Sequence, residues 1–296
     1  GSDDEIFEPA LSNLSKTNIL PPETGWFPEK IQRDVEGVIL GMHARQDNPE
    51  LQRALELSLP VYSFPEYIYR ESIHKKRIAI GGSHGKTTIT SMVMHVLKNT
   101  GVDFDYLVGA RLEGFDQSVK ISDAPVIVCE ADEYPASIIE KRPKFHFLFP
   151  HIAVISGIAW DHINIFRTFE NYCKQFAVFI EKIQSGGVLI YNSNDENLKE
   201  IITHTERDDI RFIPYGLPDY SVINGVTWIK KESETVALQV FGDHNLMNIE
   251  AAFQVCRELG IAVRDFVHAI ASFKGASKRL EMIYQSEDCN VYRDFA

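Results

Sequence analysis

The pattern of apolar and polar positions in the middle of the chain predicts short buried strands that alternate with amphipathic helices. Four runs are apolar and rich in β-branched residues, as in strands that are buried on both faces. They lie at 77–82, 125–132, 151–158 and 186–192. Helical periodicity follows the first of them at 89–101 and recurs at 169–183, before the last. Strands that alternate with helices predict an α/β fold with a mainly parallel sheet.

The two flanking stretches have different patterns. Before residue 72, strand-like runs at 35–41 and 59–64 enclose a helical pattern at 47–57, which leaves room only for a small, incomplete Rossmann-like unit. From Asp219 to Gly242 the chain alternates with period two and contains Asn224-Gly225, a strong hairpin signal. This second stretch predicts a small antiparallel β-meander, after which two more helices are expected.

Composition narrows the class of protein. The 296 residues suggest about two domains, at ~150 residues per domain. Asp and Glu outnumber Lys and Arg by 42 to 30, so the net charge is −12 and neither nucleic acid nor an anionic membrane is an expected partner. No signal peptide or membrane span is apparent, and the four cysteines form no CxxC pair, which argues against a zinc site or a disulfide framework. We therefore expect a cytoplasmic protein.

The sharpest chemical signal is the run GGSHGKTT at 81–88, between a predicted strand and a predicted helix. Small residues there allow backbone N–H groups to surround phosphate oxygens at the helix N-terminus. Lys86 would reach the β- and γ-phosphates, and the Thr87 hydroxyl would bind Mg²⁺. The residues expected to bind the phosphates are Gly82, Ser83, His84, Gly85, Lys86, Thr87 and Thr88. Ile80 stands where the general P-loop pattern has a glycine, and a plain helix-capping turn is the alternative.

Acidic and histidine side chains follow two other predicted strands. Glu130 comes directly after one strand, and Asp161 and His162 come after the next. The carboxyl ends of parallel strands face the crevice where ligands bind, so Glu130 and His162 are candidates to share a divalent ion with Thr87. The alternatives are a solvated acidic loop and a histidine that bonds only to a loop carbonyl.

A fourth signal lies at the start of the helix that follows the meander. His244, Asn245 and Asn248 stand close together there, and an Asn amide offers the paired donor and acceptor that an adenine edge needs. Simple capping of the helix by Asp243 or Asn245 is the alternative.

Five motifs, taken in order, resemble the Mur ligase family of ATP-dependent amide-forming enzymes. They are GSHGKTT, EADE at 130–133, the Asp161–His162 pair, HNLMN at 244–248 and the final RDFA. The resemblance spans nearly all of the chain, and it implies a P-loop-type central domain that uses ATP and Mg²⁺, with Mn²⁺ as a substitute.

The resemblance also assigns roles to residues. Lys86, Glu130 and His162 would be catalytic, and Arg279 and Asp294 would contact the nucleotide. The implied reaction forms an acyl phosphate on UDP-N-acetylmuramate and then an amide, in peptidoglycan synthesis or recycling. Two branches fit, one joining L-alanyl-γ-D-glutamyl-meso-diaminopimelate and the other L-alanine. EADEY, EKRPKF at 140–145, DHINIF and KRLE at 278–281 resemble the tripeptide branch.

The family pattern further implies domain boundaries. Residues 1–72 would form a UDP-sugar-binding domain without its first strand, 73–288 the central ATP-binding domain, and 289–296 the start of a third domain that selects the amine. The sequence then looks like a fragment, and we expect residues 1–296 alone to form no amide. We expect the phosphate loop to be exposed, so that Lys86→Ala abolishes ATP turnover and leaves the fold intact.

Two other classes of protein share part of these features. A nucleotide-binding regulatory protein would have the phosphate loop without a UDP-sugar site. A small-molecule kinase would have the loop and the metal residues but would stop at phosphoryl transfer.

Overall fold

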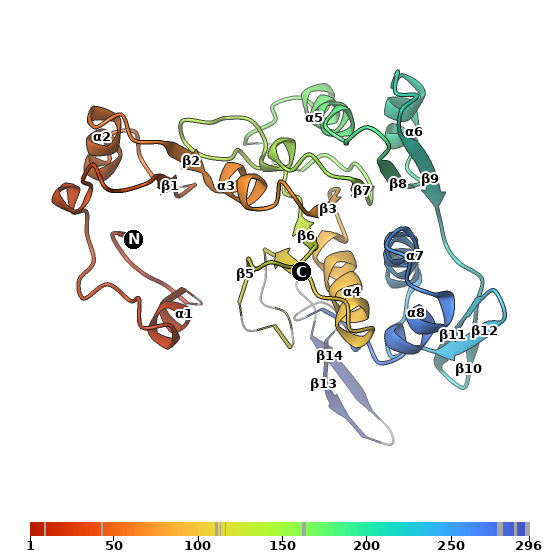
Figure 1. The fold of residues 1–296 in the computed structure, drawn as a ribbon. Helices are drawn as coiled ribbons and strands as arrows, with labels where there is room; N and C mark the ends of the chain where they lie inside the picture. Colours follow the sequence, from red (N-terminus) through yellow and green to blue (C-terminus); the bar gives the residue numbers. More distant parts are fainter. Residues whose placement is uncertain are drawn as a thin grey trace. The chain divides into compact units, whose positions relative to one another are not determined.

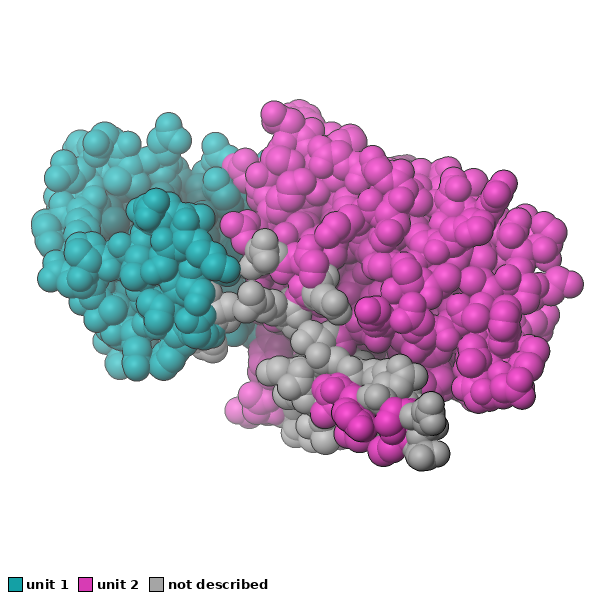
Figure 2. All heavy atoms as spheres, turned by 90° about the horizontal axis from the view of Figure 1, so that it is seen from below, with its two compact units in different colours: residues 1–70, 135–143 teal, residues 71–134, 144–296 magenta. Residues whose placement is uncertain are grey.

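The computed structural model describes residues 1–296 except 9, 43, 110, 111, 113, 116, 162, 163, 277–280, 287, 288 and 294–296. The chain forms two compact units, which are coloured separately in Figure 2. One comprises residues 1–70 and 135–143, and the other comprises 71–134 and 144–296. The domain boundaries at 72 and 288 stay a prediction.

The first unit is small and contains a two-stranded sheet. Its elements are α1 (Ala10–Lys16), the 3₁₀ turn η1 (Pro28–Lys30), β1 (Val38–Leu40), α2 (Pro49–Glu56), β2 (Val61–Ser63) and α3 (Phe64–Glu71), whose last residue already belongs to the second unit. β1 and β2 are parallel, with Val38 opposite Val61. Helix α2 begins at Pro49, because the Asn48 side chain accepts from the N–H groups of Glu50 and Leu51.

A seven-stranded sheet forms the centre of the second unit. Its strands are β3 (Lys76–Gly81), β4 (Asp105–Leu107), β5 (Val119–Lys120), β6 (Val126–Glu130), β7 (Ile152–Ile155), β8 (Val188–Asn192) and β9 (Arg211–Tyr215). The order is β5-β4-β6-β3-β7-β8-β9, and every pair is parallel except β4 with β5. β3 is therefore central, with β6 and β7 on either side. The predicted α/β fold class is confirmed.

Helices cover both faces of this sheet (Figure 1). One face carries α4 (Lys86–Asn99), α7 (Asp243–Glu258) and α8 (Val263–Ile270), and the other carries α5 (Phe169–Glu181), α6 (Glu196–Thr203) and the 3₁₀ turn η2 (Lys144–Phe147). On the α5 side, Phe145, Phe176 and Phe179 are fully buried, and the rings of Phe145 and Phe179 stack 4.7 Å apart. No described helix is both long enough and apolar enough to cross a bilayer.

The predicted meander is confirmed as a three-stranded antiparallel sheet. It consists of β10 (Tyr220–Ile223), β11 (Val226–Lys231) and β12 (Glu234–Ala237). Asn224 and Gly225 connect the first two strands with φ angles of 51° and 76°, which is why this pair suits a two-residue hairpin turn. Near the chain end, β13 (Glu281–Gln285) and β14 (Asn290–Arg293) form a separate antiparallel pair.

Candidate functional site

The loop between β3 and α4 has a backbone that only glycine fits at two positions. Gly82 has a φ of 119°, and a Cβ there would lie 2.3 Å from Ser156 Oγ. Gly85 has a φ of 79° and caps α4, and a Cβ there would lie 2.6 Å from Asn248 Oδ1. The glycines therefore allow the loop to lie directly against the ends of β7 and α7.

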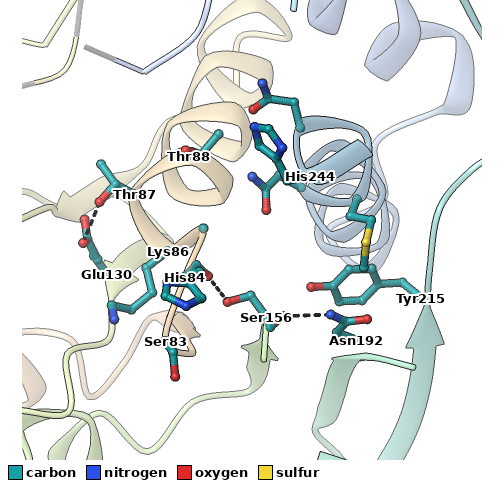
Figure 3. Close-up of a pocket in the computed structure, with 14 residues that line it drawn as sticks. Ser83, His84, Lys86, Thr87, Thr88, Glu130, Ser156, Asn192, Tyr215 and His244 are labelled. Carbon is teal, nitrogen blue, oxygen red and sulfur yellow. Dashed lines mark hydrogen bonds between the residues drawn. The ribbon is translucent and has the colours of Figure 1, made fainter. Parts of the chain in front are cut away.

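A cavity of about 610 Å³ opens beside this loop, within the size range of small-molecule sites. It lies where β3, β6, β7, β8 and β9 end, on the side of α7 (Figure 3). The residues that line it are Ser83, His84, Gly85, Lys86, Thr87, Thr88, Glu130, Ser156, Asn192, Tyr215, His244, Asn245, Met247 and Asn248. Most of the residues predicted to bind phosphate or adenine are thus together at one cavity.

Lys86 is less exposed than the sequence suggests. Its Nζ lies 3.0 Å from Glu133 Oε2 and donates to the carbonyl of Gly82 at 2.6 Å. The Lys86 side chain is 15% exposed and that of Glu133 is 0% exposed. The expectation that the loop is exposed is therefore wrong, because Lys86 forms an ion pair in the interior.

The two described residues of the predicted metal site lie together. The Thr87 hydroxyl donates to Glu130 Oε1 at 2.9 Å (Figure 3). Glu130 Oε2 accepts the backbone N–H of Gly109 at 3.1 Å. Among the described residues, no group of three His, Cys, Asp or Glu side chains is close enough to bind a metal ion. The third predicted ligand, His162, lies outside the described residues, as do Arg279 and Asp294.

The start of α7 presents its side chains in different ways. His244 is exposed and lines the cavity, and Asn248 lies against Gly85. Asn245 is buried, and its amide donates to the backbone carbonyl of Phe241 at 2.9 Å. One donor of the Asn245 amide is therefore already used within the protein.

Several residues at the cavity were not among the predicted site residues. Ser156 follows β7 and donates to the carbonyl of His84, and Asn192 ends β8 and donates to the Ser156 carbonyl at 3.1 Å (Figure 3). Tyr215 ends β9, and burial raises the pKa of its hydroxyl. Ser156 and Asn192 follow or end predicted strands, so the rule that selected Glu130 would have found both, whereas Tyr215 ends a strand that was not predicted.

Comparison with known proteins identifies the family. The family model described as the Mur ligase middle domain matches residues 80–256, more than half of the chain. The matched range includes the phosphate loop, Glu130 and the start of α7. The chain belongs to the Mur ligase family. Mur ligases use ATP to form amide bonds.

Individual Mur ligases resemble this chain over much of its length. A UDP-N-acetylmuramate–L-alanine ligase from Arthrobacter sp. is 32% identical over 88% of this chain and 56% of its own length. A UDP-N-acetylmuramate–L-alanyl-γ-D-glutamyl-meso-2,6-diaminoheptandioate ligase from Haemophilus influenzae is 28% identical over 95% of this chain and 67% of its own. The chain thus spans little more than half of the Arthrobacter ligase.

A solved structure has the same fold. The UDP-N-acetylmuramate:L-alanyl-γ-D-glutamyl-meso-diaminopimelate ligase from Neisseria meningitides superposes with a TM-score of 0.80 at 24% identity. The superposition covers 93% of this chain and 90% of that one.

Proposed function

We propose that the complete protein is an ATP-dependent ligase that joins L-alanyl-γ-D-glutamyl-meso-diaminopimelate to the carboxylate of UDP-N-acetylmuramate. The observation that carries the proposal is the position of Lys86 and of the Thr87–Glu130 pair at one cavity, beside a loop in which two positions require glycine. This arrangement offers backbone N–H groups, a cation and oxygen ligands to a polyphosphate.

The described residues fit a divalent ion. The Thr87 hydroxyl and the Glu130 carboxylate are 2.9 Å apart, and both are oxygen donors of the kind that Mg²⁺ prefers. We assign these two residues, together with His162, to the ion, which would neutralise charge on the phosphates when bound. A histidine ligand also suits Mn²⁺.

The residues of this chain act by positioning and by charge. The substrate carboxylate attacks the γ-phosphorus of ATP, so that ADP leaves and an acyl phosphate forms. The amine then attacks the acyl carbon, and inorganic phosphate leaves as the amide forms. Lys86 stabilises the negative charge that moves onto the phosphate oxygens, which is the main way proteins catalyse phosphoryl transfer. No nucleophile from the protein is needed.

The domain assignment belongs to the same proposal. Residues 1–72 would bind the UDP-sugar, 73–288 would bind ATP, and 289–296 would begin the domain that selects the amine. Arg279, Asp294, His244, Asn245 and Asn248 would contact the nucleotide. L-Alanine is the second candidate amine, because relatives with either name match the chain.

The test supplies the complete gene product with ATP, Mg²⁺, UDP-N-acetylmuramate and either the tripeptide or L-alanine. We expect a product whose mass equals UDP-N-acetylmuramate plus the tripeptide minus water, with one ADP and one phosphate formed for each amide. Amide only with L-alanine would identify the other branch. ADP without amide from either amine would contradict a ligase and favour a kinase or an ATPase.

A further inference from the structure

Glu133 has no role in the reaction as proposed above, and yet its carboxylate is buried directly beside Lys86, which lines the cavity. Its side chain is 0% exposed, and its two oxygens lie 3.0 and 3.2 Å from Lys86 Nζ. Burying a carboxylate is costly unless a cation or hydrogen-bond donors compensate for the lost water. The buried position of Glu133 therefore depends on Lys86 and on the donors around it.

Tyr172, in α5, holds the same carboxylate from another side. Its hydroxyl donates to Glu133 Oε1 at 3.0 Å and lies 2.9 Å from the hydroxyl of Ser83. Ser83 in turn both donates to and accepts from the backbone of Ala159, each at 2.8 Å. Burial and the charge of Glu133 raise the pKa of Tyr172, so the phenol keeps its proton and remains a donor. Glu133 is thus fixed between α5 and the phosphate loop.

Lys86 would therefore have to contact both Glu133 and a bound phosphate. An ammonium group has three N–H donors, and the Gly82 carbonyl and Glu133 already accept from it. Lys86 also lines the cavity, so a phosphate that binds there must share the ammonium group with Glu133. We propose that Glu133 is a positioning residue that competes with phosphate for Lys86. It aims the ammonium group at the reacting phosphate and, by its charge, weakens nucleotide binding. This inference rests on the proposed function, which assigns Lys86 to the nucleotide.

Removing the charge of Glu133 should strengthen nucleotide binding but slow the reaction, so the two effects can be measured separately. A carboxylate that shares a cation with a bound phosphate repels that phosphate, so removing the carboxylate's charge strengthens binding. Releasing the ammonium group from its fixed position slows the reaction, since a misplacement of about 1 Å can cost about 100-fold in rate. A residue that only stabilised the fold would lower binding and rate together.

The first variant is Glu133→Gln, which keeps the shape of the side chain and an acceptor for Tyr172. We expect its dissociation constant for ADP with Mg²⁺, measured by isothermal titration calorimetry, to fall about three- to tenfold. In the complete protein, kcat should fall at least about tenfold while KM for ATP does not rise. Asp132→Asn is the matched control, because it removes the same charge one residue earlier, from a carboxylate that pairs with Lys144 at 2.8 Å. The control should stay close to wild type in both measurements.

Glu133→Asp separates charge from position and also covers the case in which the Gln variant does not fold. It keeps the charge but shortens the side chain, so we expect ADP affinity close to wild type and a kcat at least about tenfold lower. Three results would overturn the inference: a Gln variant that binds ADP no more tightly than wild type, a control that tightens binding equally, or an Asp variant with wild-type kcat. A wild-type protein that does not bind ADP would remove the proposed function itself, and this inference with it.

Discussion

Lys86→Ala tests whether the lysine of the phosphate loop also stabilises the fold. The substitution removes one partner of an ion pair whose carboxylate is 0% exposed and whose ammonium-bearing side chain is 15% exposed. Breaking a buried pair in this way leaves a charge without compensation and typically costs about 3–5 kcal/mol. We therefore expect the variant to lose stability as well as ATP turnover, in contrast to the expectation from the sequence.

Thermal unfolding measured by calorimetry checks the size of the effect. At about 2–4 °C per kcal/mol for a unit of this size, the midpoint should fall by about 6–20 °C. The double variant Lys86→Ala/Glu133→Gln removes both charges and should recover much of that loss, which a double-mutant cycle measures directly.

The control is Lys144→Ala, which breaks the partly exposed pair with Asp132 and should cost less than about 1 kcal/mol. A Lys86→Ala midpoint within about 2 °C of wild type would refute the reasoning from burial. A double variant no more stable than the single variant would refute it equally.

Three further substitutions test other parts of the structure. Gly85→Ala places a Cβ 2.6 Å from Asn248 Oδ1 at a φ of 79°, so calorimetry should show a loss of about 1–3 kcal/mol, and an unchanged midpoint would contradict the packing. Glu130→Gln should raise the Mg²⁺ concentration for half-maximal turnover on the order of tenfold or more, as a titration of the complete protein would show. Burial pushes the pKa of Asp105 upward, but hydrogen bonds from Lys75 and Ser122 outweigh it and hold that pKa below its ordinary value. The stability that Asp105 contributes is therefore present above its unfolded pKa of about 4 and is lost as pH falls through the lower folded value. The difference in unfolding free energy between wild type and Asp105→Asn should accordingly narrow below about pH 4.

Local signals in the sequence predicted the central elements well. The apolar run before Gly81, the glycines after it and the helical period that follows are all short-range patterns, and they predicted β3, the loop and α4 within a few residues. The Asn224-Gly225 turn was equally readable, because few other pairs adopt positive φ at two successive positions.

Most of the elements that the sequence did not predict are too short to show a periodic pattern or contain a residue that argues against a strand. β4 and β5 are only three and two residues long, too short to show a period. β9 contains Pro214, which argues against a strand unless it lies at an edge, where the structure places it. Helix α6 is an exception: it was missed although its capping residue is a clear signal, since the Asp195 side chain accepts from the N–H of Leu198.

The candidate site could be predicted only in part because it depends on strand order. Glu130 and Thr87 were both selected, but nothing in the sequence states that their side chains touch. Glu133 was seen within EADE, whereas its contacts with Lys86 and Tyr172 join three separate segments and required the folded sheet. Such long-range contacts are fixed by topology, which local patterns do not contain.

The central place of β3 also determines when the cavity can form during folding. Arg77 pairs with Ile127 and Ile78 with Ile152, so the two strands beside the phosphate loop come from about fifty and about seventy-five residues farther along the chain. Closing such long segments costs entropy before any contact compensates for it, and pairings of this kind form slowly. During synthesis, β3 and α4 leave the ribosome well before β7 and Ser156, which follows β7 and lies against Gly82. The proposed binding of nucleotide would therefore arise only once the sheet has assembled on both sides of β3, and binding of ADP during refolding would report that late event.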